Sequence, residues 1–123
     1  MKYLHLTITS NTTSIELPNK IYWTKLTLER CDMVEINGPT DKSEYCICID
    51  DISRDLIVYS SSGCIERSTT FIVAAQPWNC QEVQTVKNMS PSTPLTTFEL
   101  TIRKMTGTLA SVTNPFTIKL RFD

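Results

Sequence analysis

The sequence is poor in the residues that most catalytic motifs need. It contains three glycines and a single histidine among 123 residues. A loop that cradles phosphates needs several closely spaced glycines, so this class of nucleotide site is excluded. One imidazole also removes most catalytic triads and most zinc sites from consideration. We therefore predict that the protein is not an enzyme.

An excess of charge of one sign is also lacking. Twelve Lys and Arg stand against thirteen Asp and Glu, which leaves a formal net charge of −1. Nucleic acids and anionic membranes favour partners with a clear positive excess. We therefore expect no direct contact with nucleic acid and no insertion into a membrane.

Long hydrophobic runs are absent. The longest apolar runs, such as residues 71–75, are far too short to cross a bilayer, and the first residues are not followed by the apolar stretch of a signal peptide. We expect the protein to be made and kept in the cytoplasm. In that reducing compartment the five cysteines, Cys31, Cys46, Cys48, Cys64 and Cys80, would remain free thiols.

What the sequence does contain is a series of short alternating runs. In residues 2–9, Leu4, Leu6 and Ile8 share one face while His5 and Thr7 share the other, which is the period of a half-buried strand. The same pattern predicts eight strands, at residues 2–9, 21–30, 33–36, 44–50, 55–60, 69–76, 96–104 and 115–122. The length suits one domain, residues 1–123, so the expected fold class is all-β, an eight-stranded antiparallel sandwich.

Turn-forming residues separate these runs. Residues 37–39, 50–53, 60–63 and 106–108 are rich in Gly, Pro, Asn, Asp, Ser or Thr and predict connections between neighbouring antiparallel strands. Residues 77–94 include three prolines and predict a long loop with one short strand at residues 82–86. Long loops are where binding residues often lie.

The last thirty residues show the clearest alternation. Strands at residues 96–104 and 115–122 are expected to form a hairpin whose polar faces bring Arg103, Lys119 and Arg121 together. Residues 41–55, by contrast, hold five carboxylates. Opposite charges of this kind would suit a contact between subunits.

Two patterns are candidate metal sites. Cys46 and Cys48 share one face of a strand and offer half of a zinc site, but the other cysteines are isolated and the alternative is that both are small buried hydrophobes. Residues 51–62 place oxygens as a calcium loop does, but Leu56 and Ser62 stand where glycine and glutamate are needed. We predict no metal and no cofactor.

The single histidine and the two tryptophans are either buried or available for contacts. His5 lies on the polar face of its strand and is interpreted as exposed or interfacial. Trp23 is predicted to belong to the core. Trp78, beside Asn79 in the long loop, is either a binding hot spot or a plug for the open end of the sandwich.

The order of the strands, with a long loop before the final pair, resembles a single jelly roll of the viral capsid type. The stretch from Phe98 through Gly107 to Phe122 is similar to the last strands of small capsid and penton subunits of large DNA viruses and their relatives. The resemblance implies a subunit that self-associates in rings and joins a shell. The chain departs from the pattern because no basic N-terminal arm precedes the alternation that starts at Leu4.

The leading functional hypothesis is a structural capsid subunit, penton or minor, that forms a pentamer or trimer and contacts other capsid proteins in the virion. Its contact candidates are Trp78, Asn79, Arg103, Lys119 and Arg121. One alternative is a carbohydrate-binding attachment module, in which Trp78 or Tyr59 stacks on a sugar while Asn79 or Asp55 binds hydroxyls. A third hypothesis, a small hydrolase, is supported only by His5 and by carboxylates that cannot be assigned to a site.

Overall fold

The protein is an antiparallel β-sandwich. A computed structural model describes residues 1–33, 36, 43–50, 56–59, 63–66, 68–75, 84–88 and 91–123. These residues contain no helix. Their strands are β1 (Lys2–Ile8), β2 (Thr12–Ile21), β3 (Lys25–Cys31), β4 (Glu44–Asp50), β5 (Leu56–Tyr59), β6 (Gly63–Glu66), β7 (Ser68–Ala74), β8 (Gln84–Lys87), β9 (Leu95–Lys104) and β10 (Phe116–Phe122).

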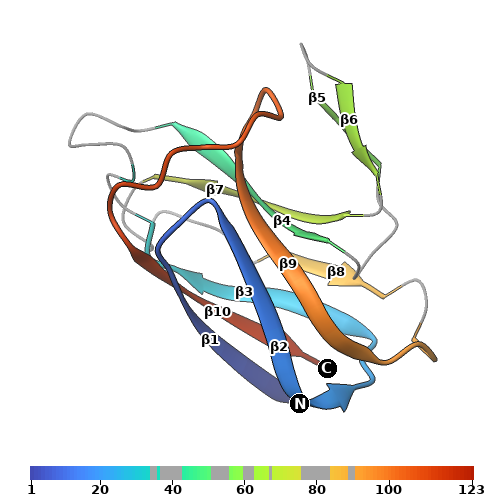
Figure 1. Cartoon of the computed structure of the whole chain (residues 1–123). Helices are drawn as coiled ribbons and strands as arrows, with labels where there is room; N and C mark the ends of the chain where they lie inside the picture. The colour runs from blue at the N-terminus through green and yellow to red at the C-terminus, as the bar shows by residue number, and fades with distance from the viewer. Residues whose placement is uncertain are drawn as a thin grey trace.

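Eight of these strands form two four-stranded sheets that face each other (Figure 1). Sheet A has the order β1-β10-β3-β8 and sheet B has the order β2-β9-β4-β7. Strands β5 and β6 pair with each other and stand apart from both sheets at the upper right of Figure 1. The predicted all-β sandwich with eight antiparallel strands is confirmed.

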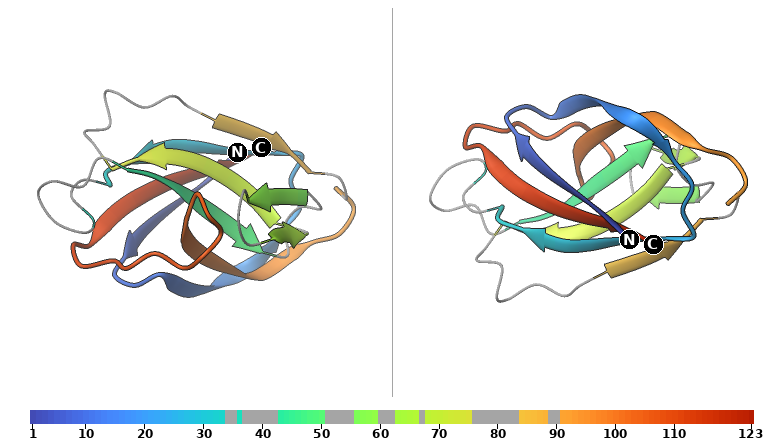
Figure 2. Two further views of the ribbon diagram at one scale, coloured as in Figure 1. Left: turned by 90° about the horizontal axis from the view of Figure 1, so that it is seen from above. Right: turned by 90° about the horizontal axis from the view of Figure 1, so that it is seen from below.

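The strand pairs are nested along the chain. The first strand, β1, pairs with the last, β10, while β2 pairs with β9, β3 with β8 and β4 with β7. Two further pairs, β10 with β3 and β9 with β4, complete the sheets. The two ends of the chain therefore lie side by side, because Lys2 is opposite Phe122 (Figures 1 and 2).

The core fills the space between the sheets with apolar side chains. Strand β10 shows the pattern most clearly, since Phe116, Ile118, Leu120 and Phe122 alternate with more exposed residues. Phe122 packs edge-on against Trp23, with 5.7 Å between ring centroids and 78° between ring planes. Only 3% of Trp23 is exposed, so its predicted place in the core is confirmed. Other side chains that are fully buried are Ile8, Leu26, Leu28, Met33, Ile36, Ile47, Ile49, Phe71, Leu100 and Ile102.

The first correction concerns residues 12–30. Strand β2 was not predicted, although Thr13, Ile15 and Leu17 are its less exposed positions and alternate with polar neighbours. Pro18 interrupts the pattern, and proline is tolerated because β2 is an edge strand. The single strand predicted for residues 21–30 is wrong, because the chain leaves sheet B after β2 and enters sheet A at β3.

The middle of the chain differs in smaller ways. Of the strand predicted at residues 33–36, Met33 and Ile36 are buried but lie outside strands, and the residues between them fall outside the described part. The strand predicted at residues 55–60 contains β5, and β6 was not predicted. The short strand predicted at residues 82–86 is found, slightly later, as β8.

The predicted C-terminal hairpin is wrong. Strand β9 belongs to sheet B and β10 to sheet A, so the segment between them crosses from one layer to the other. The turn at residues 106–108 does form, with Gly107 at a φ of 97° and its N–H donating to the carbonyl of Lys104 over 2.9 Å. It therefore leads into a crossing rather than directly into a neighbouring strand.

A side-chain amide links the two sheets along one side of the sandwich. Gln84 of β8 accepts a hydrogen bond from the N–H of Ile72 in β7 over 2.9 Å and donates one to the Ile72 carbonyl. The amide thus replaces the peptide group of a further strand at the β7 edge. As a result, the edges of sheet A and sheet B are joined at this point.

Replacing Phe122 tests the importance of the final strand. Phe122→Ala is expected to lower the free energy of unfolding by about 3–5 kcal/mol, because it removes a buried ring and its contact with Trp23. Urea denaturation followed by tryptophan fluorescence measures the change. Tyr22→Ala, at a residue that is 60% exposed, serves as the control and should change stability by less than about 0.5 kcal/mol. Equal effects of the two variants would contradict the assigned packing.

Replacing Gln84 tests the link between the sheets. Gln84→Ala is expected to lower the free energy of unfolding by about 0.5–1 kcal/mol, because the amide and carbonyl of Ile72 lose their partner at an edge where water can partly replace it. Native-state hydrogen exchange should show faster exchange at the Ile72 amide. Lys87→Ala, at an exposed position of the same strand, is the matched control and should leave that exchange rate unchanged.

Candidate functional site

The outer face of sheet A is shaped by a β-bulge in β3. Lys119 is opposite Arg30 and Leu120 is opposite Leu28, so Glu29 is an extra residue in the pairing with β10. A bulge lets two consecutive side chains point to the same side of a sheet. Here Glu29 is placed among the cationic side chains of β10, while Arg30 remains exposed beside it.

Glu29 connects two of the predicted contact residues. Its carboxylate lies 3.5 Å from the ammonium of Lys119 and 2.5 Å from the guanidinium of Arg121. Lys119 also lies over the ring of Tyr3 on β1, 4.6 Å from the centroid. Arg121 donates a second bond to Asp123 over 3.0 Å, and this bond, with the contacts to Glu29, raises the pKa of the guanidinium against the opposing effect of desolvation.

Asp32 forms a second group just beyond the end of β3. Its carboxylate accepts hydrogen bonds from Arg30 Nε over 3.0 and 3.3 Å and from the hydroxyl of Thr117 over 2.8 Å. Desolvation raises the pKa of Asp32, but the bonds from Thr117 and Arg30 outweigh it, so the pKa lies below its usual value. The carboxylate thus holds one side chain from each of two neighbouring strands.

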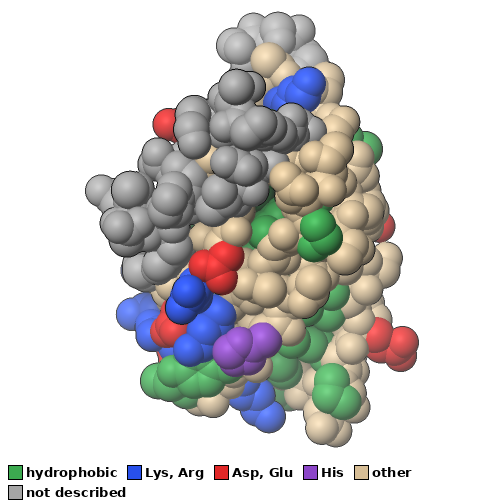
Figure 3. Space-filling model, turned by 90° about the vertical axis from the view of Figure 1, so that its left-hand side faces the viewer, with side chains coloured by type: hydrophobic (Ala, Val, Ile, Leu, Met, Phe, Trp, Pro, Cys, Tyr) green, Lys and Arg blue, Asp and Glu red, His purple; other side chains and the backbone are tan. Residues whose placement is uncertain are grey.

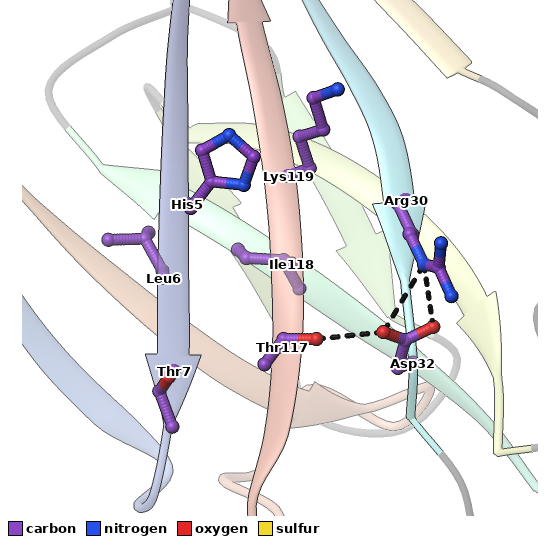
Figure 4. A pocket seen from close by; sticks show the side chains of 8 residues that line it. All are labelled: His5, Leu6, Thr7, Arg30, Asp32, Thr117, Ile118 and Lys119. Atoms are coloured by element: carbon purple, nitrogen blue, oxygen red, sulfur yellow. Dashed lines mark hydrogen bonds and ion pairs between the residues drawn. The ribbon is translucent and has the colours of Figure 1, made fainter.

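Between these groups lies a shallow basin of about 400 Å³. Figure 4 shows its walls, with His5 on β1, Thr117 and Lys119 on β10, and Arg30 and Asp32 on the far side. In the space-filling view the histidine lies next to a group of cationic side chains (Figure 3). The side chain of His5 is exposed. The basin therefore has a polar lining in which acidic partners already hold Arg30 and Lys119 in place.

The predicted contact residues are only partly brought together. Lys119 and Arg121 share the outer face of sheet A, as expected. Arg103 lies on β9 of sheet B, so the predicted cluster of all three is wrong. The guanidinium of Arg103 instead donates to the carbonyl of Gly107 over 2.8 Å and supports the turn after β9.

Several other candidates fall outside the described residues. These are Trp78, Asn79 and Asp55, together with residues 41–42 and 51–55 of the acidic segment and residues 51–55 and 60–62 of the calcium-like loop. The side chain of Tyr59 is not described either. The carbohydrate-binding alternative depends on these side chains and stays a prediction.

The cysteines on β4 lie on the side of sheet B away from the core. Tyr45, Ile47 and Ile49 belong to the core cluster, whereas Cys46 and Cys48 are buried outside it. The thiol of Cys46 donates to the sulfur of Met105 over 3.5 Å. Across the described residues, no group of three or more His, Cys, Asp or Glu side chains is placed to hold a metal ion.

Cys31 is buried within sheet A. Burial raises the pKa of its thiol to about 12, more than a hydrogen bond with the Met33 backbone lowers it. The thiol is therefore protonated at neutral pH, and a protonated thiol is a poor nucleophile.

Sequence reasoning missed Glu29, Arg30 and Asp32. A signal for them was available, because the buried residues Leu28 and Cys31 are three positions apart rather than two. Such a break in strict alternation indicates a bulge. To predict the acidic partner of Lys119 and Arg121, one must know which strand lies beside β10. The spacing of residues along the chain does not give this information.

Comparison of the chain with protein-family models, with curated proteins and with solved structures found no match. The described residues also include no helix with the length and apolar character that a membrane span requires.

Replacing Asp32 tests the polar group on this face. Asp32→Asn is expected to lower the free energy of unfolding at pH 7 by about 0.5–1 kcal/mol, a small value because the carboxylate is partly exposed to solvent. The lowered pKa means that the carboxylate stabilises the fold above about pH 4 and loses this effect as pH falls through the folded-state value. Urea denaturation at several pH values should therefore show the two proteins converging in acid.

Glu16→Gln is the matched control, because Glu16 is an exposed carboxylate on the other sheet. It should show no such convergence. A difference between wild type and Asp32→Asn that stays constant down to about pH 2 would contradict the role given to the carboxylate.

Proposed function

We propose that the protein is a non-enzymatic structural subunit with a single jelly-roll fold, of the penton or minor capsid type, that self-assembles into a closed symmetric ring. The observation that carries this proposal is the nested strand pairing. The first strand pairs with the last, the second with the next to last, and the pattern continues inward. The two halves of the chain therefore run antiparallel to each other and together form the two sheets. Jelly rolls of eight strands have this two-sheet arrangement and are common in viral capsid and lectin domains.

The packing of the interior supports a role in assembly. The space between the sheets is filled by large apolar side chains, among them Phe71, Leu100 and Leu120. Partners would therefore be bound on the outer faces, loops and strand edges. Burial of these surfaces against other subunits, rather than a reaction, would be the mechanism.

The outer face of sheet A is the surface best prepared for such a contact. Lys119 and Arg121 are held by Glu29, so little side-chain freedom remains to be lost on binding. We propose that this face contacts a neighbouring subunit, which would form a pentamer or trimer. Other capsid proteins would bind the completed ring in the virion after synthesis in the host cytoplasm.

The proposal is tested by measuring mass in solution by light scattering over a wide range of protein concentrations. We expect masses that are multiples of the 14.0 kDa chain, with three or five copies favoured and with weaker association at high salt. Lys119→Ala should weaken the association, whereas Lys20→Ala, an exposed lysine on sheet B, should not. A species of 14.0 kDa at every concentration would overturn the proposal.

A further inference from the structure

The four strand edges of the sandwich differ in their ability to accept another strand. In sheet B, β2 contains Pro18 and loses its regular register between Glu16 and Ile21, and the β7 edge is occupied by the amide of Gln84. In sheet A, β8 has four residues. Strand β1 has seven residues, no proline and an unbroken register with β10. It is therefore the most regular free edge among the described strands.

An exposed regular edge is a template for pairing, because every second residue directs its N–H and carbonyl away from the sheet. The apolar residues of β1 are also incompletely covered, since Leu4 and Leu6 are only half-buried. Beside this edge lies a groove of about 170 Å³, lined in part by Leu4, Leu17, Ile21 and Phe122. A strand added to β1 would extend the apolar face of sheet A over this opening.

The sequence of β1 is suited to pairing with itself. Antiparallel pairing that keeps all seven residues in register makes the middle residue, His5, face itself across a two-fold axis. In that register Leu4 is opposite Leu6, and both lie on the inner face of the sheet. Tyr3 is opposite Thr7 on the outer face, which is a pairing of an aromatic with a β-branched side chain.

We propose that a second copy of this chain pairs with the β1 edge in this antiparallel register and joins two sheets A into one continuous sheet. The inference rests on the self-assembly proposed above and names one of its contacts. Such a contact is isologous, so each edge supplies the hydrogen-bond donors and acceptors that pair with the other edge. It would link subunits across two-fold axes, in addition to the contacts that close a ring.

The central position of His5 places residue 5 among charged side chains of the neighbouring strands. Lys119 of β10 lies directly across from His5, and Arg30 and Asp32 of β3 line the same basin. Asp32 is already bonded to Arg30, so two positive charges introduced at residue 5 on the axis would have a lysine on either side and little compensation.

The β1 contact is tested by introducing charged side chains at residue 5. His5→Lys and His5→Glu each place two like charges opposite each other at the axis and should raise the dissociation constant of the β1 contact about tenfold or more. An equimolar mixture of the two variants should restore association, because opposite charges then meet. His5 is exposed, so both variants should fold like the wild type, which circular dichroism checks. Ser14→Lys, at an exposed position of the β2 edge, is the control and should associate normally.

Light scattering and native mass spectrometry of the variants, alone and mixed, distinguish the outcomes. Loss of the two-fold association in each single variant, with its recovery in the mixture as species that contain both masses, supports the contact. Association of the wild type that neither variant changes would overturn this inference while leaving the proposed assembly in place. A wild type that stays monomeric at every concentration would overturn both.

Discussion

The fold depends on the insertion of the last strand between two early ones. Strand β10 lies between β1 and β3, and its apolar side chains, from Phe116 to Phe122, complete the core on the side of sheet A. Strand β9 has the same place in sheet B, between β2 and β4. Neither sheet is complete until the C-terminal part of the chain has joined it. Folds that rely on contacts this distant in sequence usually form slowly, because loop closure precedes the gain from packing.

The same insertion explains what could be read from the sequence and what could not. Alternation identifies strands locally, which is why β1, β4, β9 and β10 were predicted within one or two residues. It does not tell which strands are neighbours. The strong patterns at Phe98 and Phe116 suggested a hairpin, whereas the two strands belong to different layers. Strand β2 was missed because Pro18 masks a clear alternation, and only its position at an edge makes that proline acceptable.

On the polar face of sheet A, too, only some of the residues could be predicted from the sequence. Lys119 and Arg121 were identifiable because they lie two apart on a strand with an apolar opposite face. Their acidic partner, Glu29, comes from a strand about ninety positions away in sequence, and it reaches them through a bulge. An irregularity of one residue in β3 thus converts a row of repelling cations into a balanced and ordered surface.

The amide of Gln84 also limits what the molecule can build. Continuous cross-β growth requires that each newly added chain offer a further open edge to the next. In this sandwich the β7 edge is already engaged by Gln84, and Pro18 interrupts the opposite edge of the same sheet. Both edges of sheet B are therefore poor templates for the addition of another chain. A single glutamine in β8 would in this way help to protect one edge of a sheet-rich protein from pairing with other chains.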